Sequence, residues 1–137
     1  MNKQRRSDIQ AGIDAANEAL GALGEILSEP EFCVQIWDEL RGHADNALAT
    51  FQTACDEEQE YYDNMPENMQ GGMKGDAAQE AIDQLNNAIG AMEYALDNLP
   101  AGSGDAPGEV TDAHRARLED AVAELENAIE AAEQATV

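Results

Sequence analysis

The chain has 137 residues, with 29 Asp and Glu against 7 Lys and Arg, so its formal net charge is −22. A chain of this length forms one domain, or one domain with an appended element. The charge argues against direct binding of DNA or RNA, because recognition of the phosphate backbone needs clustered Lys and Arg. It also argues against docking on an anionic membrane surface, which attracts basic segments.

The composition separates this chain from disordered acidic chains, which contain few apolar residues. Here 43% of the residues are hydrophobic, although only 4% are aromatic. The apolar residues recur at steps of three and four, which is the spacing of one helix face. The composition therefore predicts ordered helices around a narrow core in which Ala fills much of the space.

The sequence shows no sign of export or membrane insertion. No apolar signal segment follows the polar start at Met1–Arg6, and no run approaches the ~20 apolar residues of a membrane span. We expect a cytoplasmic protein with reduced thiols. Cys33 and Cys55 fall on one predicted helix, about 33 Å apart at the helical rise, beyond disulfide reach. Both are expected to face the core, and the acids that follow Cys55 would raise its pKa.

The first predicted helix covers residues 8–27. Ser7 and Gln10 have the spacing of a capping box at its start. Its apolar positions follow steps of four and three, which is typical of a helix stripe and of a heptad seam: Ile9, Ile13, Ala16, Leu20, Leu23 and Leu27. Three glycines weaken the helix intrinsically and are expected to permit close helix approach: Gly12, Gly21 and Gly24.

The second predicted helix covers residues 29–65 and follows the first after a very short turn, as an antiparallel hairpin. Ser28 and Glu31 have the spacing of a capping box, with Pro30 in the first turn. Gly42 is the position most prone to interrupt the helix. Its stripe again follows steps of three and four: Cys33, Trp37, Leu40, Ala44, Leu48 or Ala47, Phe51, Cys55, Glu58, Tyr62 and Met65.

Residues 66–75 contain one Pro and three Gly, a composition that predicts turns. Asp76 is the expected cap of a third helix over residues 77–99. This helix has the most regular stripe of the chain: Ala78, Ile82, Leu85, Ile89, Met92, Leu96 and Leu99. A Gly- and Pro-containing linker over residues 101–110 follows it.

The fourth predicted helix covers residues 111–137, begins at a Thr111 cap and is rich in Ala and Glu. Together these patterns predict an all-α fold of elongated antiparallel helical hairpins, a helical bundle of about four helices with heptad-like seams. Residues 1–100 would form a three-helix antiparallel bundle, and residues 101–110 would link it to the acidic C-terminal helix. The sequence leaves open whether that last helix packs on the bundle.

The sequence lacks the spacings that catalysis or metal binding requires. The glycines of residues 71–75 follow a helix and lack the Walker spacing, and residues 63–68 lack the glycine of a calcium-binding EF-hand loop. His43 and His114 have no Cys or His companions for zinc and are expected at the surface or at helix ends. No pair of acids stands out as a catalytic pair. We therefore expect a non-enzymatic protein, with no catalytic residue, no metal and no cofactor.

One stretch resembles a known group of proteins. Residues 57–70, which read EEQEYYDNMPENMQ, are followed by AIDQL at residues 81–85. This resembles small acidic all-helical proteins carried by phages and prophages, in which a helix ending in a "DNMP" corner precedes a helix reading "AID-x-L". The resemblance covers about residues 50–99, with a further helix like residues 3–27. The resemblance implies a phage setting, and with it the cytoplasm of the host cell. Because that family has no settled function, the resemblance transfers no functional residues.

The phage setting and the charge together predict an inhibitor of a host defence nucleoprotein or nuclease, of the anti-CRISPR or anti-restriction type. Acting as a DNA mimic, the chain would hold carboxylates on rigid helices against a basic nucleic-acid-binding surface. The second predicted helix is the most acidic element, although its stripe points Glu58 inward. The predicted partner-binding residues are Asp56, Glu57, Glu60, Tyr61, Asp63 and Glu67. The predicted secondary acidic face consists of Glu119, Asp120, Glu124, Glu126, Glu130 and Glu133.

Two other functions compete with this prediction. The heptad seams suit a helical scaffold or coiled-coil interaction protein, including a homodimer, whose acidity serves only solubility. A small-ligand binder that captures a nucleotide would need a cationic pocket, built from the seven basic residues that the chain has.

Overall fold

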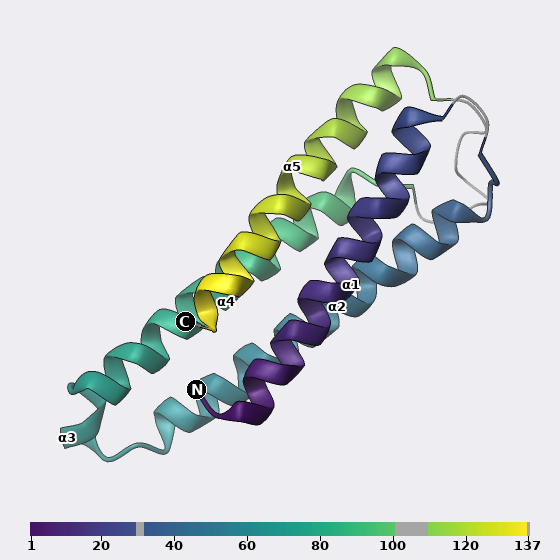
Figure 1. Cartoon of the computed structure of the whole chain (residues 1–137). Helices are drawn as coiled ribbons and strands as arrows, with labels where there is room; N and C mark the ends of the chain where they lie inside the picture. The colour runs from purple at the N-terminus through teal and green to yellow at the C-terminus, as the bar shows by residue number, and fades with distance from the viewer. Residues whose placement is uncertain (30–31, 101–109, 137) are drawn as a thin grey trace.

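A computed structural model describes residues 1–29, 32–100 and 110–136. These ranges contain five helices and no strand, which confirms the predicted all-α bundle (Figure 1). The helices are α1 (Lys3–Ser28), α2 (Ile36–Asp63), α3 (Glu67–Gln70), α4 (Met73–Asp97) and α5 (Asp112–Ala135).

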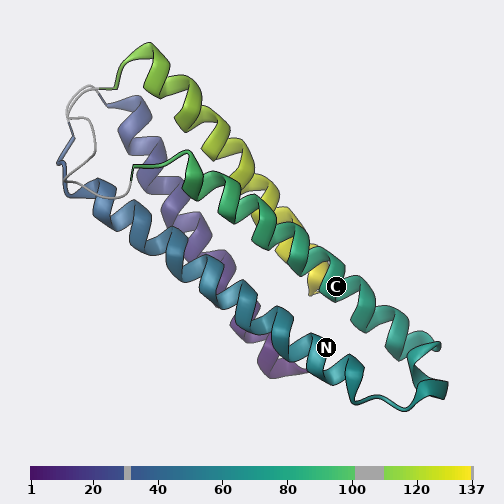
Figure 2. The same cartoon turned by 180° about the vertical axis from the view of Figure 1, so that it is seen from behind.

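The four long helices form an elongated up-down-up-down bundle (Figures 1 and 2). Helices α1 and α4 run in one direction, and α2 and α5 run in the other. Each long helix packs on two neighbours, in the cyclic order α1, α2, α4, α5, and the short helix α3 packs on α4. Helix α2 therefore lies diagonally across the bundle from α5. Because α5 packs on both α4 and α1, the fourth helix is part of the bundle rather than a separate extension.

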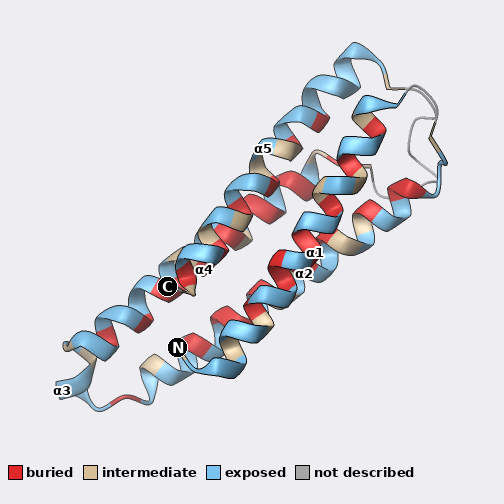
Figure 3. Cartoon of the chain, in the orientation of Figure 1, coloured by how far each residue is buried: buried red, intermediate tan, exposed pale blue. Residues whose placement is uncertain are grey.

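The apolar stripes meet along the bundle axis (Figure 3). Large buried side chains such as Trp37, Phe51 and Leu85 alternate with many buried alanines, which lets the helices approach closely. Gly12 is one point of close approach, because a Cβ there would lie only 2.7 Å from Phe51 Cε1. Gly21 and Gly24 do not share this role. They are exposed, and a Cβ at either would meet nothing within 4 Å.

Helix α1 begins earlier than the sequence pattern indicates. Asn2 is its N-cap, and the Asn2 side chain accepts a hydrogen bond of 2.8 Å from the backbone N–H of Arg5. The predicted capping box of Ser7 and Gln10 is therefore wrong. The residues between the two caps are Lys, Gln and Arg, which are good helix formers, so the helix extends back to the earlier cap.

The start of α2 also differs from the prediction. Ser28 is the last residue of α1, so it does not cap α2, which begins at Ile36. Pro30 and Glu31, the rest of that predicted box, lie outside the described residues. The connection between the two helices is thus longer than a very short turn. It contains Cys33, which is exposed and not helical, so the prediction that Cys33 lies on the second helix and faces the core is wrong.

The remaining boundaries differ by a few residues, and one short helix, α3, was not predicted. Helix α2 continues through Gly42 and ends at Asp63 rather than residue 65. Helix α4 begins at Met73, with Gly72 as a cap that offers no side chain, so Asp76 lies in the first turn and is not the cap. The Thr111 cap of α5 is confirmed. The predicted linker falls mainly on residues 101–109, outside the described part of the chain.

Candidate acidic interface

The predicted partner-binding residues are all exposed at one end of the bundle, on α2 and α3. Asp56, Glu60 and Asp63 share the face of α2 that points away from the core, because steps of four and three return a side chain to the same side. Glu57 lies beside them, and these four acids are called the α2 acidic face below. They span about 10.5 Å of helix axis. That is one carboxylate per ~3.5 Å, close to the ~3.4 Å per phosphate along one DNA strand.

The secondary acidic face lies on α5. Five of its six acids are exposed, and the sixth, Glu124, is half-buried and accepts a weak hydrogen bond of 3.4 Å from Asn127. Because α2 and α5 are diagonal neighbours in the bundle, the two acidic faces point in opposite directions. The structure does not bring the two predicted sets together into one surface.

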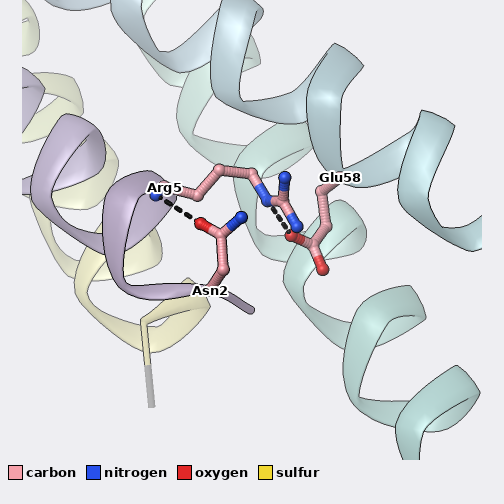
Figure 4. Close-up of polar contacts among 3 residues, drawn as sticks. All are labelled: Asn2, Arg5 and Glu58. Atoms are coloured by element: carbon pink, nitrogen blue, oxygen red, sulfur yellow. Dashed lines mark hydrogen bonds and ion pairs between the residues drawn. The ribbon is translucent and has the colours of Figure 1, made fainter.

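Glu58 belongs to the interior and not to the acidic surface, as its stripe position predicted. Its side chain is 0% exposed, and its Oε2 lies 2.8 Å from Nε of Arg5, which is 11% exposed (Figure 4). The other oxygen, Oε1, has no hydrogen-bond partner in the part of the chain that the structure describes. Sequence reasoning missed Arg5 as the partner of Glu58. The one available signal was the basic cluster that opens the chain.

Tyr61 is held in place by the same arginine. The Cζ atom of Arg5 lies 5.4 Å from the centroid of the Tyr61 ring, within the range of a cation–π contact. Tyr61 as a whole keeps 38% of its surface exposed. A predicted anchor for a partner is therefore already ordered, which lowers the entropic cost of contacting it.

Three further arginines bind backbone carbonyls at helix ends. Arg41 Nη1 donates to the carbonyl of Leu96 over 2.9 Å. Arg115 Nη2 donates to the carbonyl of Leu27 over 3.0 Å, and Arg117 does the same for Asp97 at 3.3 Å. Carbonyls in the last turn of a helix lack an intrahelical donor and carry the negative end of the helix dipole, so a cation there is favourable.

With Arg5, four of the seven basic residues bind groups on another helix. Arg5 is almost buried and Arg41 is half-buried, whereas Arg115 and Arg117 stay exposed. Within the described ranges, Arg5–Glu58 and Arg41–Asp45 are ion pairs, and Nδ1 of His43 lies 3.0 Å from a carboxylate oxygen of Glu18. None of these contacts involves the α2 acidic face or the secondary acidic face, so no basic side chain of the described residues lies within ion-pair distance of either.

Two acids of the α2 acidic face, Glu60 and Asp63, lie in the last turn of α2 and oppose the helix dipole. Carboxylates near a helix C-terminus are unfavourable by about 0.3–1 kcal/mol each when exposed, and the last turn of α2 contains no basic residue. Within this face, the hydrogen bond of 2.9 Å from Gln59 to Asp63 provides one local compensation. A local rule broken at exposed positions is a feature that proteins commonly show at functional sites.

The thiols and histidines of the described residues have structural surroundings. Burial, followed by the charge of Asp56, raises the pKa of Cys55, and its Sγ lies 3.6 Å from Oδ1 of Asn86. His114 completes the cap of α5 by accepting from the backbone of Thr111. No group of three or more His, Cys, Asp or Glu within the described ranges is placed to hold a metal ion.

Two cavities at the end of the bundle where α5 begins each contain one arginine. The smaller, of about 210 Å³, is lined by Trp37, His114 and Arg117 among others. The larger, of about 510 Å³, includes Arg115. Both guanidinium groups already donate to backbone carbonyls, so neither cavity gathers the several free cations that a nucleotide would need.

Comparison with protein-family models, with curated proteins and with solved structures finds no match for this chain. Among the described residues, no helix combines the length and the apolar character needed to cross a membrane.

Proposed function

We propose that this chain is a non-enzymatic inhibitor that occupies the basic nucleic-acid-binding surface of a host defence protein, either a nuclease or a defence nucleoprotein complex. One observation carries the proposal. The exposed carboxylates of the α2 acidic face stand at about the axial density of DNA phosphates, while four of the seven basic residues are held in contacts with other helices.

The physical basis is charge complementarity on a rigid support. A groove that binds phosphates presents Lys and Arg side chains, which form charge-assisted hydrogen bonds with carboxylates as well. Opposite charge steers the encounter and makes its rate fall with salt. Because the α2 acidic face lies on a helix packed on two neighbours, little conformational entropy is lost when a partner binds it.

The packing weakens the competing case for a coiled-coil scaffold. That case depends on apolar seams available to a second chain. In this chain the stripe residues pack on one another within the monomer, so the seams are already covered. A phage origin, as an anti-CRISPR or anti-restriction protein, remains part of the proposal and rests on the resemblance of residues 50–99 to phage proteins.

The proposal is tested by DNA cleavage assays. Plasmid cleavage by a purified restriction endonuclease and by an RNA-guided DNA-cleaving complex is measured with and without the chain, at low and high salt. In parallel, the chain is used to capture proteins from bacterial lysate, with and without competing duplex DNA. We expect inhibition or DNA-competed capture that is strongest at low salt.

A matched pair of variants locates the surface. The first neutralises the α2 acidic face with Asp56→Asn, Glu57→Gln, Glu60→Gln and Asp63→Asn. The control removes four acids from the exposed side of α4 with Glu80→Gln, Asp83→Asn, Glu93→Gln and Asp97→Asn. We expect the first to weaken binding about tenfold or more and the control to change it little, since close opposite charges act locally. Equal losses from both variants, or binding insensitive to salt and DNA, would contradict the proposal.

A further inference from the structure

The α3 end of the bundle, residues 60–76, projects past the end of α5 (Figure 1). It comprises the last turn of α2, the helix α3 and the first turn of α4. Two neighbours flank the long helices elsewhere, but α5 ends before reaching this region, so its sides are less covered (Figures 1 and 3).

Exposed apolar side chains concentrate at this end. The described residues contain five large exposed hydrophobic side chains, and three of them lie here: Tyr61 at 38%, Met69 at 38% and Met73 at 90% exposure. Single exposed apolar residues are ordinary on a protein surface, whereas a local concentration is a feature of interaction sites. Methionine adapts its shape to a partner and is used at surfaces that bind apolar side chains.

Internal contacts fix α3 against its neighbours. The side chain of Gln70 donates a hydrogen bond of 3.0 Å to the carbonyl of Tyr62, which joins α3 to α2. On the other side, Gly75 packs so closely on Gln70 that a Cβ there would overlap the Gln70 carbonyl oxygen. Met69 and Met73 therefore project from a supported backbone and not from a loose loop, which favours binding at a low ordering cost.

The charge around these side chains specifies the chemistry of a partner. Four exposed acids lie in residues 60–76, against one base, Lys74: Glu60, Asp63, Glu67 and Asp76. A surface that combines apolar side chains with a rim of carboxylates complements a segment with basic and apolar residues side by side. A helix with Lys or Arg on one face and Leu-like residues on the other has this chemistry.

We propose that the α3 end is a docking site for a basic amphipathic helix of a partner protein, with Met69 and Met73 as the apolar anchors and the surrounding acids as the electrostatic guide. This inference rests on the proposed function for the identity of the partner. It adds which part of that partner the chain binds. The acids would set the association rate, and the methionines would set the dissociation rate.

The test uses two synthetic helical peptides as probes. One carries Lys on one face and Leu on the other, and its match carries Ser in place of each Leu. The full chain is labelled with ¹³C at its five methionine methyl groups. We expect the Lys/Leu peptide to bind more tightly than the Lys/Ser peptide and to shift the signals of Met69 and Met73, while the fully buried Met92 serves as an internal reference.

A double variant, Met69→Ser with Met73→Ser, is compared with Tyr94→Ser, which removes a half-exposed aromatic ring elsewhere on α4. We expect the double variant to weaken the Lys/Leu peptide about tenfold, which corresponds to ~1.4 kcal/mol, and Tyr94→Ser to leave it unchanged. Unmoved methionine signals, equal binding of the two peptides, or an equal loss in both variants would overturn the docking site. Peptide binding at the α3 end without any DNA-competed inhibition would instead overturn the proposed function alone.

Discussion

The buried pair of Arg5 and Glu58 gives the sharpest prediction about stability. Replacing Arg5 with Met keeps a long apolar side chain. It removes the one hydrogen-bond partner that a fully buried carboxylate has among the described residues, where its second oxygen already lacks one. Removing one partner of a buried ion pair destabilises a protein by roughly 3–5 kcal/mol, because the remaining charge is desolvated without compensation. Losing the contact with the Tyr61 ring adds about 0.5–1 kcal/mol at this partly exposed position. We therefore expect Arg5→Met to lower the free energy of unfolding by at least ~3 kcal/mol.

The second half of this prediction concerns the double variant Arg5→Met with Glu58→Met. Apolar side chains of similar volume often replace a buried pair without loss, and here the wild-type pair is incompletely hydrogen-bonded. The double variant should therefore recover stability to the wild-type level or above. Urea denaturation followed by circular dichroism measures each free energy, with equal m-values as the check that one transition is compared. Arg6→Met, at an exposed neighbour, is the control and should stay within about 0.5 kcal/mol of wild type. A loss below ~1 kcal/mol for Arg5→Met, or a double variant as unstable as the single one, would refute this reasoning.

Two further predictions follow from the glycines and the thiols. Gly12→Ala should destabilise the bundle by about 1–3 kcal/mol, because the new methyl group meets the Phe51 ring. Gly24→Ala should stabilise it by about 0.5–1 kcal/mol, since its site is open. Thermal unfolding should therefore show a lower melting temperature for the first variant and a higher one for the second, and shifts of the same sign would contradict the packing. The raised pKa of Cys55 leaves less thiolate at a given pH, so iodoacetamide should modify the exposed Cys33 first, with mass spectrometry after digestion as the measurement. Because the folded state holds the Cys55 proton more tightly, the contribution of this thiol to the free energy of unfolding should be complete below the thiol pKa of the unfolded chain. It should fall as pH rises towards the thiol pKa of the folded chain. Urea denaturation of the wild type and of Cys55→Ala at rising pH tests this, and a stability difference in favour of the wild type that grows with pH would be evidence against it.

Apolar periodicity was sufficient to predict the bundle. Each stripe marks a helix face that must be buried, and the stripe of α2 correctly placed even the charged Glu58 inside. Helix ends were harder to predict, because several residues near a terminus can act as the cap. At the start of α1, Asn2 is the cap and the Ser7 box is not formed. At the start of α4, the cap is Gly72, which has no side chain that a capping pattern in the sequence could reveal.

The candidate interface was predictable only in part. The exposure of the α2 acidic face follows from its position opposite the stripe. The contacts of Arg41, Arg115 and Arg117 do not follow from the sequence pattern, because their acceptors are backbone carbonyls of other helices. Arg115 lies 88 residues from Leu27 in sequence, and Arg41 lies 55 from Leu96. No local pattern encodes such contacts, so the surface charge balance became visible only in three dimensions.

The order of the helices around the bundle affects how quickly the chain folds. The long helices form four main packing interfaces. Three of them join helices that are consecutive in the order α1, α2, α4, α5, and the fourth joins α1 and α5 at the two ends of the chain. Topologies dominated by such local contacts fold in about microseconds to milliseconds. The α2 acidic face and the α3 end both lie on the hairpin that α2 and α4 form. A newly synthesised chain would therefore present both surfaces soon after α4 emerges, which is the timing that the proposed inhibition of a host nuclease would require.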